Sequence, residues 1–152
     1  MSTSSVAELL KDKAQQSPQK NLFSVGPDVV LAEAVALMVN NAISSVLVVE
    51  NGEMLGLITM RELLRGLHAH GGSLMQARCR NVMKVNPAVA QFEDSVDHLR
   101  GLMTELHITH VPVMNHGALA GILSFHDIAR SAIKDVDFEN KLLKQYIKNW
   151  PE

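Results

Sequence analysis

The sequence repeats itself at a fixed offset of 65 residues, and this constrains its fold more than any other feature. Residues 21–65 align without a gap onto residues 86–130. Nine aligned positions are identical, where ordinary composition gives roughly three by chance. The identical pairs are Asn21/Asn86, Leu37/Leu102, Met38/Met103, Ile43/Ile108, Val46/Val111, Val48/Val113, Gly52/Gly117, Gly56/Gly121 and Arg65/Arg130. The chain is therefore expected to fold into two similar halves.

Each copy predicts the order strand, helix, strand, strand, helix. Short strands are expected near residues 23–25 and 88–90, each followed by a helix with apolar positions at helical spacing. Two longer strands follow in each copy, joined by the tight-turn pairs Asn51-Gly52 and His116-Gly117. A second helix is expected after Thr59 and after Ser124. We therefore predict an α/β fold of two βαββα repeats, with additional N-terminal and C-terminal helices.

The predicted boundaries place repeat 1 at residues 21–68 and repeat 2 at residues 82–132. Residues 1–20 form an N-terminal segment with a short helix, and residues 69–81 connect the repeats. Residues 133–152 predict a C-terminal amphipathic helix. Its apolar stripe, Phe138, Leu142, Leu143, Tyr146, Ile147 and Trp150, lies opposite lysines. Such a stripe packs on its own domain or a twin subunit, or it binds a different partner.

Composition excludes several classes of function. The formal charge of −2 leaves no basic field for nucleic acid or an anionic membrane, and 4% aromatic residues argue against a base-stacking platform. Cys79 is the only cysteine, which suits a reducing compartment. No apolar run reaches the roughly 18 residues of a membrane span, and the first residues do not resemble a signal peptide. We expect a cytoplasmic protein.

One motif at the start of each closing helix can bind a ligand. Thr59 and Ser124 end a strand and begin a helix, so each hydroxyl and the free N–H groups of that helix face the same space, which favours an anion. Glu62 and Asp127 follow one turn later, and a carboxylate can accept both hydrogens of a ribose diol. The alternative is a capping box that only starts the helix, and the two roles can coexist.

Arginines follow both acids by three residues. Arg65 and Arg130 can reach a phosphate, or they can pair with the acid of their own helix. Asp127 is shorter and better held than Glu62, so the sequence favours the second motif as the ligand site.

The two motifs, Gly56-Leu-Ile-Thr-Met-Arg-Glu62 and Gly121-Ile-Leu-Ser-Phe-His-Asp127, resemble those of a tandem pair of cystathionine-β-synthase (CBS) domains, a Bateman module. The segment His107-Ile-Thr-His-Val-Pro-Val113 is similar to the helix-to-strand junction of that family. The resemblance implies a sensor that binds AMP, ADP, ATP, S-adenosylmethionine or NAD(H) between its repeats, with AMP the first expectation.

The resemblance also implies roles for individual residues. The acid of the closing motif binds the ribose and the Ser or Thr lies near phosphate, which gives Asp127 with Ser124 and, in the first copy, Glu62 with Thr59. Main-chain groups beside the second strand hold the adenine, and there the predicted contacts are His110, Val111 and Pro112. His126 stands inside the motif where similar proteins often have glycine, so it either touches phosphate or narrows the cleft. Pro112 frees main-chain groups for a ligand, or it marks an edge strand.

The remaining residues suggest neither metal nor catalysis. The seven histidines lack the spacing and the carboxylate of a metal site, and no nucleophile, base or paired-acid constellation stands out. We expect a homodimer that reports ligand occupancy to an unidentified regulated protein. The alternative is a ligand-free dimeric scaffold whose clefts are filled by Met60, Phe125 and His126.

Overall fold

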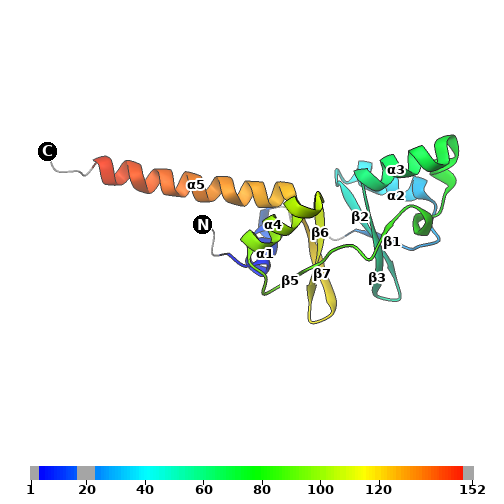
Figure 1. The fold of residues 1–152 in the computed structure, drawn as a ribbon, viewed down its shortest axis with the longest axis horizontal. Coiled ribbons are helices and arrows are strands. Elements are labelled where there is room, and N and C mark those ends of the chain that lie inside the picture. Colours follow the sequence, from blue (N-terminus) through cyan, green and yellow to red (C-terminus); the bar gives the residue numbers. More distant parts are fainter. Residues whose placement is uncertain (1–3, 17–22, 149–152) are drawn as a thin grey trace.

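The computed structural model describes residues 4–16 and 23–148, with the main chain alone described for 146–148. It contains two mixed α/β halves side by side, each with its own sheet (Figure 1). The first sheet has the strand order β1-β2-β3-β4 and the second has the order β5-β6-β7. In both, a parallel pair precedes an antiparallel hairpin, as two βαββα repeats require.

The elements of repeat 1 lie close to their predicted positions. They are β1 (Ser24–Val25), α2 (Leu31–Asn40), β2 (Ser45–Glu50), β3 (Glu53–Thr59) and α3 (Met60–His70). The first sheet also contains β4 (Lys84–Val85), a strand that the sequence analysis does not predict and that lies at residues assigned to repeat 2. The elements of repeat 2 are β5 (Ala90–Gln91), α4 (Val96–Leu106), β6 (His110–Asn115), β7 (Ala118–Ser124) and α5 (Phe125–Lys148). Helix α1 (Val6–Gln16) precedes both, and two 3-10 turns, η1 (Gly71–Gln76) and η2 (Cys79–Asn81), lie between them.

Both predicted hairpins are confirmed. Asn51 and Gly52 have φ values of 53° and 78°, and His116 and Gly117 have φ values of 50° and 80°. Two successive residues with positive φ form the tight turn whose twist matches the flanking strands. Both hairpins therefore hold their strands in the same register, with Ser45 opposite Thr59 and His110 opposite Ser124.

The segments outside the repeats are exchanged between the two cores. Helix α1 precedes repeat 1 in the sequence but packs in repeat 2, where Val6 and Leu9 are buried with Leu99 and Val111. Figure 1 shows α1 beside β5, β7 and α4. Conversely, Leu74 and Cys79 of the connection, together with Val82 just after it, are buried in the core of repeat 1. The connection is thus part of the first hydrophobic core.

Pro112 lies in a central strand, so its interpretation as an edge-strand residue is wrong. β6 has β5 on one side and β7 on the other. The proline is accommodated because β5 pairs only with Val113 and Met114, so Pro112 lies outside that short parallel ladder.

Helix α5 joins two elements that the sequence analysis separates at residue 133. It runs without a break through Lys148 and extends away from the body of the molecule (Figure 1). Neither glycine nor proline occurs in its 24 residues, so nothing in the sequence stops the helix. Tyr146 and Ile147 of the predicted stripe lie where only the main chain is described, and Trp150 lies outside the described residues. No helix in the described ranges is both long and apolar enough to cross a membrane.

Candidate functional site

Two cavities lie between the repeats, and their linings are related by the 65-residue offset. The first has a volume of about 240 Å³ and contains Thr59, Glu62 and Arg65 of the first motif. The second has a volume of about 220 Å³ and contains Ser124, Asp127 and Arg130 of the second motif. We refer to them as the first cleft and the second cleft. The structure thus brings each predicted motif to a cavity wall, and each cavity is completed by residues of the other repeat.

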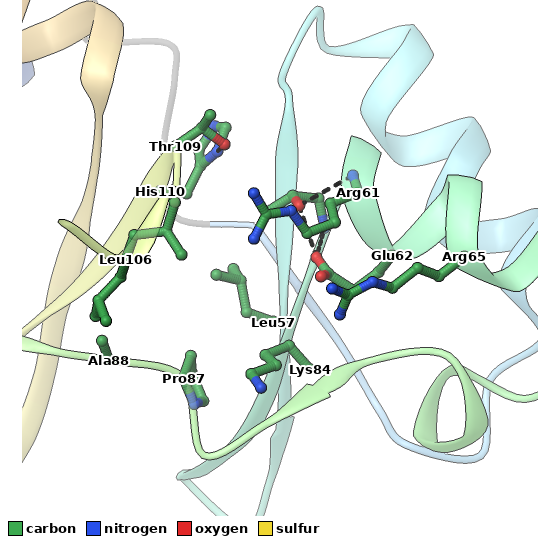
Figure 2. Close-up of a pocket in the computed structure, with 12 residues that line it drawn as sticks. Leu57, Arg61, Glu62, Arg65, Lys84, Pro87, Ala88, Leu106, Thr109 and His110 are labelled. Atoms are coloured by element: carbon green, nitrogen blue, oxygen red, sulfur yellow. Dashed lines mark hydrogen bonds between the residues drawn. The ribbon is translucent and has the colours of Figure 1, made fainter. Parts of the chain in front are cut away.

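The first cleft has a polar side and an apolar side, both visible in Figure 2. Glu62 and Arg65 extend from α3, with Arg61 on the same helix and Lys84 on β4. The apolar wall is formed by Leu57, Pro87, Ala88, Leu106 and Ile108. Three cationic side chains therefore line this cleft with a single carboxylate.

The Glu62 carboxylate is buried but only half occupied. Its Oε1 accepts hydrogen bonds from the main-chain N–H and the hydroxyl of Thr59, at 2.8 and 2.6 Å. No described residue donates to Oε2 or forms an ion pair with this acid. No buried side-chain oxygen in the described part of the chain lacks a partner, so Oε2 is accessible from the cavity. Glu62 is 6% exposed, and this acceptor opens onto the first cleft.

Both oxygens of the Asp127 carboxylate in the second cleft have partners. Its Oδ2 accepts hydrogen bonds from the main-chain N–H and hydroxyl of Ser124, at 2.8 and 3.0 Å, and contacts Nζ of Lys13 at 2.9 Å. Its Oδ1 accepts a hydrogen bond from Nη2 of Arg130 at 2.9 Å. Burial raises the pKa of Asp127, but the hydrogen bonds from Ser124 and Lys13 outweigh it and hold the pKa below its usual value. Asp127 is therefore a paired carboxylate.

Both motifs also cap their helices. The Thr59 hydroxyl accepts the Arg61 N–H at 3.3 Å, and the Ser124 hydroxyl accepts the Asp127 N–H at 3.1 Å. In both motifs the acid accepts the main-chain N–H of the Thr or Ser. The capping interpretation is thus correct for both copies. It leaves the cleft-facing side of Glu62 available, so capping does not exclude ligand contact in the first cleft.

His110 lines both clefts. Its Nε2 lies 2.7 Å from the Ser44 hydroxyl and its Nδ1 lies 2.9 Å from the Thr109 hydroxyl. Ser44 and Thr109 occupy equivalent positions of the two repeats. One imidazole therefore links the two halves between the two candidate ligand sites.

The other predicted site residues are placed unequally. His126 lines the second cleft, on the same wall as Asp127. Val111 and Pro112 are buried in β6 and are not among the residues that line either cleft. Met60 and Phe125 are exposed and line neither cleft, so the scaffold interpretation is wrong in using them as fillers. Their helix positions turn both side chains away from the cavities.

Sequence reasoning missed two residues that contact distant parts of the chain, Lys13 within repeat 2 and Arg61 between the repeats. Lys13 reaches the second cleft from α1 and donates to the main-chain oxygen of Ile122 at 2.8 Å. Arg61 donates from Nη2 to the main-chain oxygen of His107, at the left-handed end of α4. The contact of Arg61 could have been suspected from the sequence, because Arg61 follows the capping residue Thr59 by two positions. The contact of Lys13 could not, because it depends on where α1 packs.

A family model for the CBS domain matches the chain twice, at residues 14–69 and 79–134. The chain belongs to the CBS domain family. Among curated relatives, the mitochondrial CBS domain-containing protein CBSX3 of Arabidopsis thaliana is 25% identical over 96% of this chain and 73% of its own length. A solved CBS-domain containing protein from Agrobacterium tumefaciens is 31% identical, with a TM-score of 0.78 over 85% of this chain and 99% of that one.

Two more distant CBS structures contain adenosine compounds. A CBS domain protein from Pyrobaculum aerophilum, complexed with AMP, is 20% identical, with a TM-score of 0.68 over 82% of this chain and 89% of that one. The CBS domain pair of protein MJ0100, in complex with 5′-methylthioadenosine and S-adenosyl-L-methionine, is also 20% identical, with a TM-score of 0.73 over 88% of this chain and 99% of that one. At this identity the likeness shows the shared CBS-pair fold.

A third hollow, larger than either cleft, is not the best ligand site. A groove of about 590 Å³ between α4 and α5 is lined by Asp97, Asp135, Glu139 and Arg100 together with apolar side chains such as Phe138. It contains none of the motif residues, and its acids exceed its cations. The two smaller clefts, which gather the repeated motifs, are therefore the candidate sites. Within the described ranges, no three His, Cys, Asp or Glu side chains form a group suited to a metal ion.

Proposed function

We propose that this CBS pair is a regulatory module that binds an adenosine ligand in the first cleft and reports its occupancy to a partner protein. The accessible Oε2 of Glu62 carries the proposal. It faces a cavity with an apolar wall on one side and cations on the other. A nucleoside monophosphate needs the same three features: a surface for the base, an acceptor for the ribose diol and donors for the phosphate.

The charges of the first cleft support a phosphorylated ligand. Arg61, Arg65 and Lys84 outnumber Glu62 by three to one, and no described residue forms an ion pair with Arg65 or Lys84. These cations attract phosphate oxygens and repel the sulfonium of S-adenosylmethionine. The volume of about 240 Å³ lies below the usual range for ligand pockets, which favours a mononucleotide over the larger NAD(H). AMP and ADP are thus the preferred ligands.

The complexes of AMP with the Pyrobaculum protein and of S-adenosyl-L-methionine with the MJ0100 pair support a nucleoside site between CBS repeats. We propose no catalytic step, because the Thr59 hydroxyl beside Glu62 is engaged in capping α3. Asp127, Ser124, His126 and Arg130 line the second cleft at the positions equivalent to those of the first, but Asp127 is already paired with Lys13 and Arg130.

Calorimetric titration with AMP, ADP, ATP, S-adenosylmethionine and NADH tests the proposed function. We expect AMP or ADP to bind, and Glu62→Gln to weaken that binding by about 1–3 kcal/mol through loss of a charge-assisted hydrogen bond. Glu93→Gln, which changes an exposed acid away from both clefts, is the matched control. The ligand-free scaffold predicts no heat and no rise in melting temperature with any of these compounds at millimolar concentration.

We further propose that the protein acts as a homodimer. Helix α3 carries a row of exposed apolar side chains, Met60, Leu64 and Leu67, which are 66%, 69% and 55% exposed. The spacing of four and then three residues places them on one face of the helix. Exposed Ile133, Val136 and Phe138 on α5 add to the apolar surface. A second copy that covers these rows would remove them from water.

A further inference from the structure

We propose that Lys13 acts as a built-in substitute for the ligand in the second cleft, so that this CBS pair binds one nucleotide, in the first cleft. The inference rests on the proposed function and specifies its stoichiometry and regulation. Nζ of Lys13 lies 2.9 Å from Oδ2 of Asp127 and 2.8 Å from the main-chain oxygen of Ile122. The ammonium of Lys13 thus contacts both the Asp127 carboxylate and a main-chain carbonyl of β7 in the second cleft.

A count of donors shows that Asp127 cannot accept both hydroxyls of a ribose diol as it stands, because Oδ2 has three donors and Oδ1 already has one. An ionised carboxylate offers about four lone-pair sites. Asp127 receives four donors, namely the main-chain N–H and hydroxyl of Ser124, Nζ of Lys13 and Nη2 of Arg130. A ribose diol would have to displace at least one of them. Asp127 is only 4% exposed, so a displaced cation would leave a buried carboxylate to be satisfied again by the ligand.

The first cleft provides the internal comparison. Glu62 receives two donors, both from Thr59, and both on Oε1. Val6 donates to Asp94 as Cys79 donates to Val29, and Leu10 lies against Gly121 as Met83 lies against Gly56. At this spacing the counterpart of Lys13 is Asn86, which is exposed and is not among the residues that line the first cleft. The asymmetry follows from the backbone. Lys13 stands on a regular α-helix, whereas the equivalent segment contains only the short 3-10 helix η2 and then the strand β4, which ends before Asn86.

The contact also has a fixed geometry. Val6 and Leu9 are buried in the core of repeat 2 and anchor α1, and Leu10 packs against Gly121 of β7. Lys13 follows Leu9 by one helical turn, so the packing of α1 directs its ammonium at the second cleft. Because Lys13 is part of the chain, it does not lose the translational and rotational entropy that a free ligand loses on binding. A movement of α1 away from repeat 2 would withdraw Lys13 and open the second cleft.

Calorimetry with ADP on the full chain tests the inference. We expect one site in the wild type and two sites in Lys13→Met, whereas Lys13→Arg keeps the cation and should keep one site. Glu62→Gln should weaken wild-type binding at least tenfold, and the double variant Lys13→Met/Glu62→Gln should regain one site. A single site in Lys13→Met, two sites in the wild type, or loss of binding in Lys13→Met would overturn the inference while wild-type binding leaves the proposed function standing. Absence of ADP binding in every variant would overturn both.

A second measurement needs no variant. Two-dimensional amide NMR of the wild type, titrated with ADP, should show shift changes concentrated in residues 57–66 and 84–88. Amides of residues 42–45 and 122–130 should change little until ADP exceeds the dissociation constant of the first cleft many times. Equal changes in both sets at the same ADP concentration would show an open second cleft and would contradict the role of Lys13.

Discussion

The hydroxyl of Ser44 lies 2.7 Å from Nε2 of His110, although the two residues belong to different repeats. Thr109, the counterpart of Ser44 in the second repeat, contacts Nδ1 of the same ring at 2.9 Å. Both ring nitrogens are therefore engaged. Burial lowers the pKa of His110, and the ammonium of Lys13 lowers it further, against smaller opposing effects of Asp127 and Glu62. The neutral imidazole is the form that joins the repeats.

The stability of the pair should consequently fall in mild acid. The pKa of His110 is lower in the folded chain than its ordinary value of 6.5, so the unfolded chain binds more protons below that pH. The contribution of His110 is therefore fully present above pH 6.5 and decreases as the pH falls toward its folded pKa. Urea unfolding at pH 7.5 and at pH 5.0 measures the difference. His110→Gln should reduce it, and the matched variant His116→Gln, in an exposed hairpin, should leave it unchanged.

Two equivalent glycines should differ in their tolerance of a methyl group. A Cβ at Gly56 would lie 2.7 Å from the main-chain oxygen of Lys84 and 2.6 Å from the sulfur of Met83. A Cβ at Gly121 would meet only the side chain of Leu10, at 2.7 Å. Gly56→Ala should lower the free energy of unfolding by about 1–3 kcal/mol, because β4 must shift. Gly121→Ala should cost less, because Leu10 can change its rotamer; equal losses in thermal unfolding would contradict this.

The ion pair of Lys13 should stabilise the fold above the pH at which Asp127 is protonated. Lys13→Met removes a charge-assisted hydrogen bond from a buried acid and should cost about 1–3 kcal/mol at pH 7. The pKa of Asp127 lies below its usual 3.8 in the folded chain, so the stability that its ionised form provides is present above pH 3.8 and is lost as the pH falls through the folded pKa. Wild type and variant should therefore converge in denaturation experiments as the pH is lowered below 3.8. A constant difference across that range would exclude this electrostatic cause.

The anchoring of α1 can be tested by truncation of its buried side chains. Leu9 is 5% exposed in the second core, and Leu9→Ala should lower the free energy of unfolding by about 2–5 kcal/mol. Leu142→Ala removes the same atoms from an exposed position of α5 and should have little effect in the monomer. Denaturant titration of both variants provides the measurement, and a Leu9 variant as stable as the wild type would show that α1 does not belong to the second core.

The proposed dimer predicts a change of mass on substitution of one exposed leucine. Leu64→Lys places a charge at the centre of the apolar row on α3 and should shift sedimentation equilibrium toward the monomer. Glu53→Lys, at an exposed hairpin position, is the control for the added charge. An unchanged dimer in Leu64→Lys, or a wild type that sediments as a monomer, would refute the proposal that the apolar row of α3 forms the dimer interface.

The parts of the fold that the sequence predicts are those determined by neighbouring residues. Asn51-Gly52 and His116-Gly117 adopt the positive φ values that a tight hairpin needs, and Thr59 and Ser124 begin their helices. The destination of α1 could not be predicted, because an apolar helix face indicates that a helix packs without showing on which core. The contact between Lys13 and Asp127 depends on that destination.

The preference between the two clefts shows the same limit. The sequence favours Asp127 over Glu62 on side-chain length alone. The structure adds the partners: Asp127 has Lys13 and Arg130, while no described residue pairs with Glu62 across its cleft. Of Arg65 and Arg130, only Arg130 forms an ion pair with the acid of its own helix in the described part of the chain.

The exchange of flanking segments means that neither half of this protein is self-sufficient. The two family matches begin at residues 14 and 79, after Val6, Leu9 and Leu74, which seal the interiors. A fragment trimmed to either match would expose core side chains that the missing segment covers in the whole protein. Such a fragment should be insoluble or should bind another chain through that exposed surface. The unit that folds is therefore both repeats together with α1 and the connection. A chimera between relatives should keep all of these segments from the same parent.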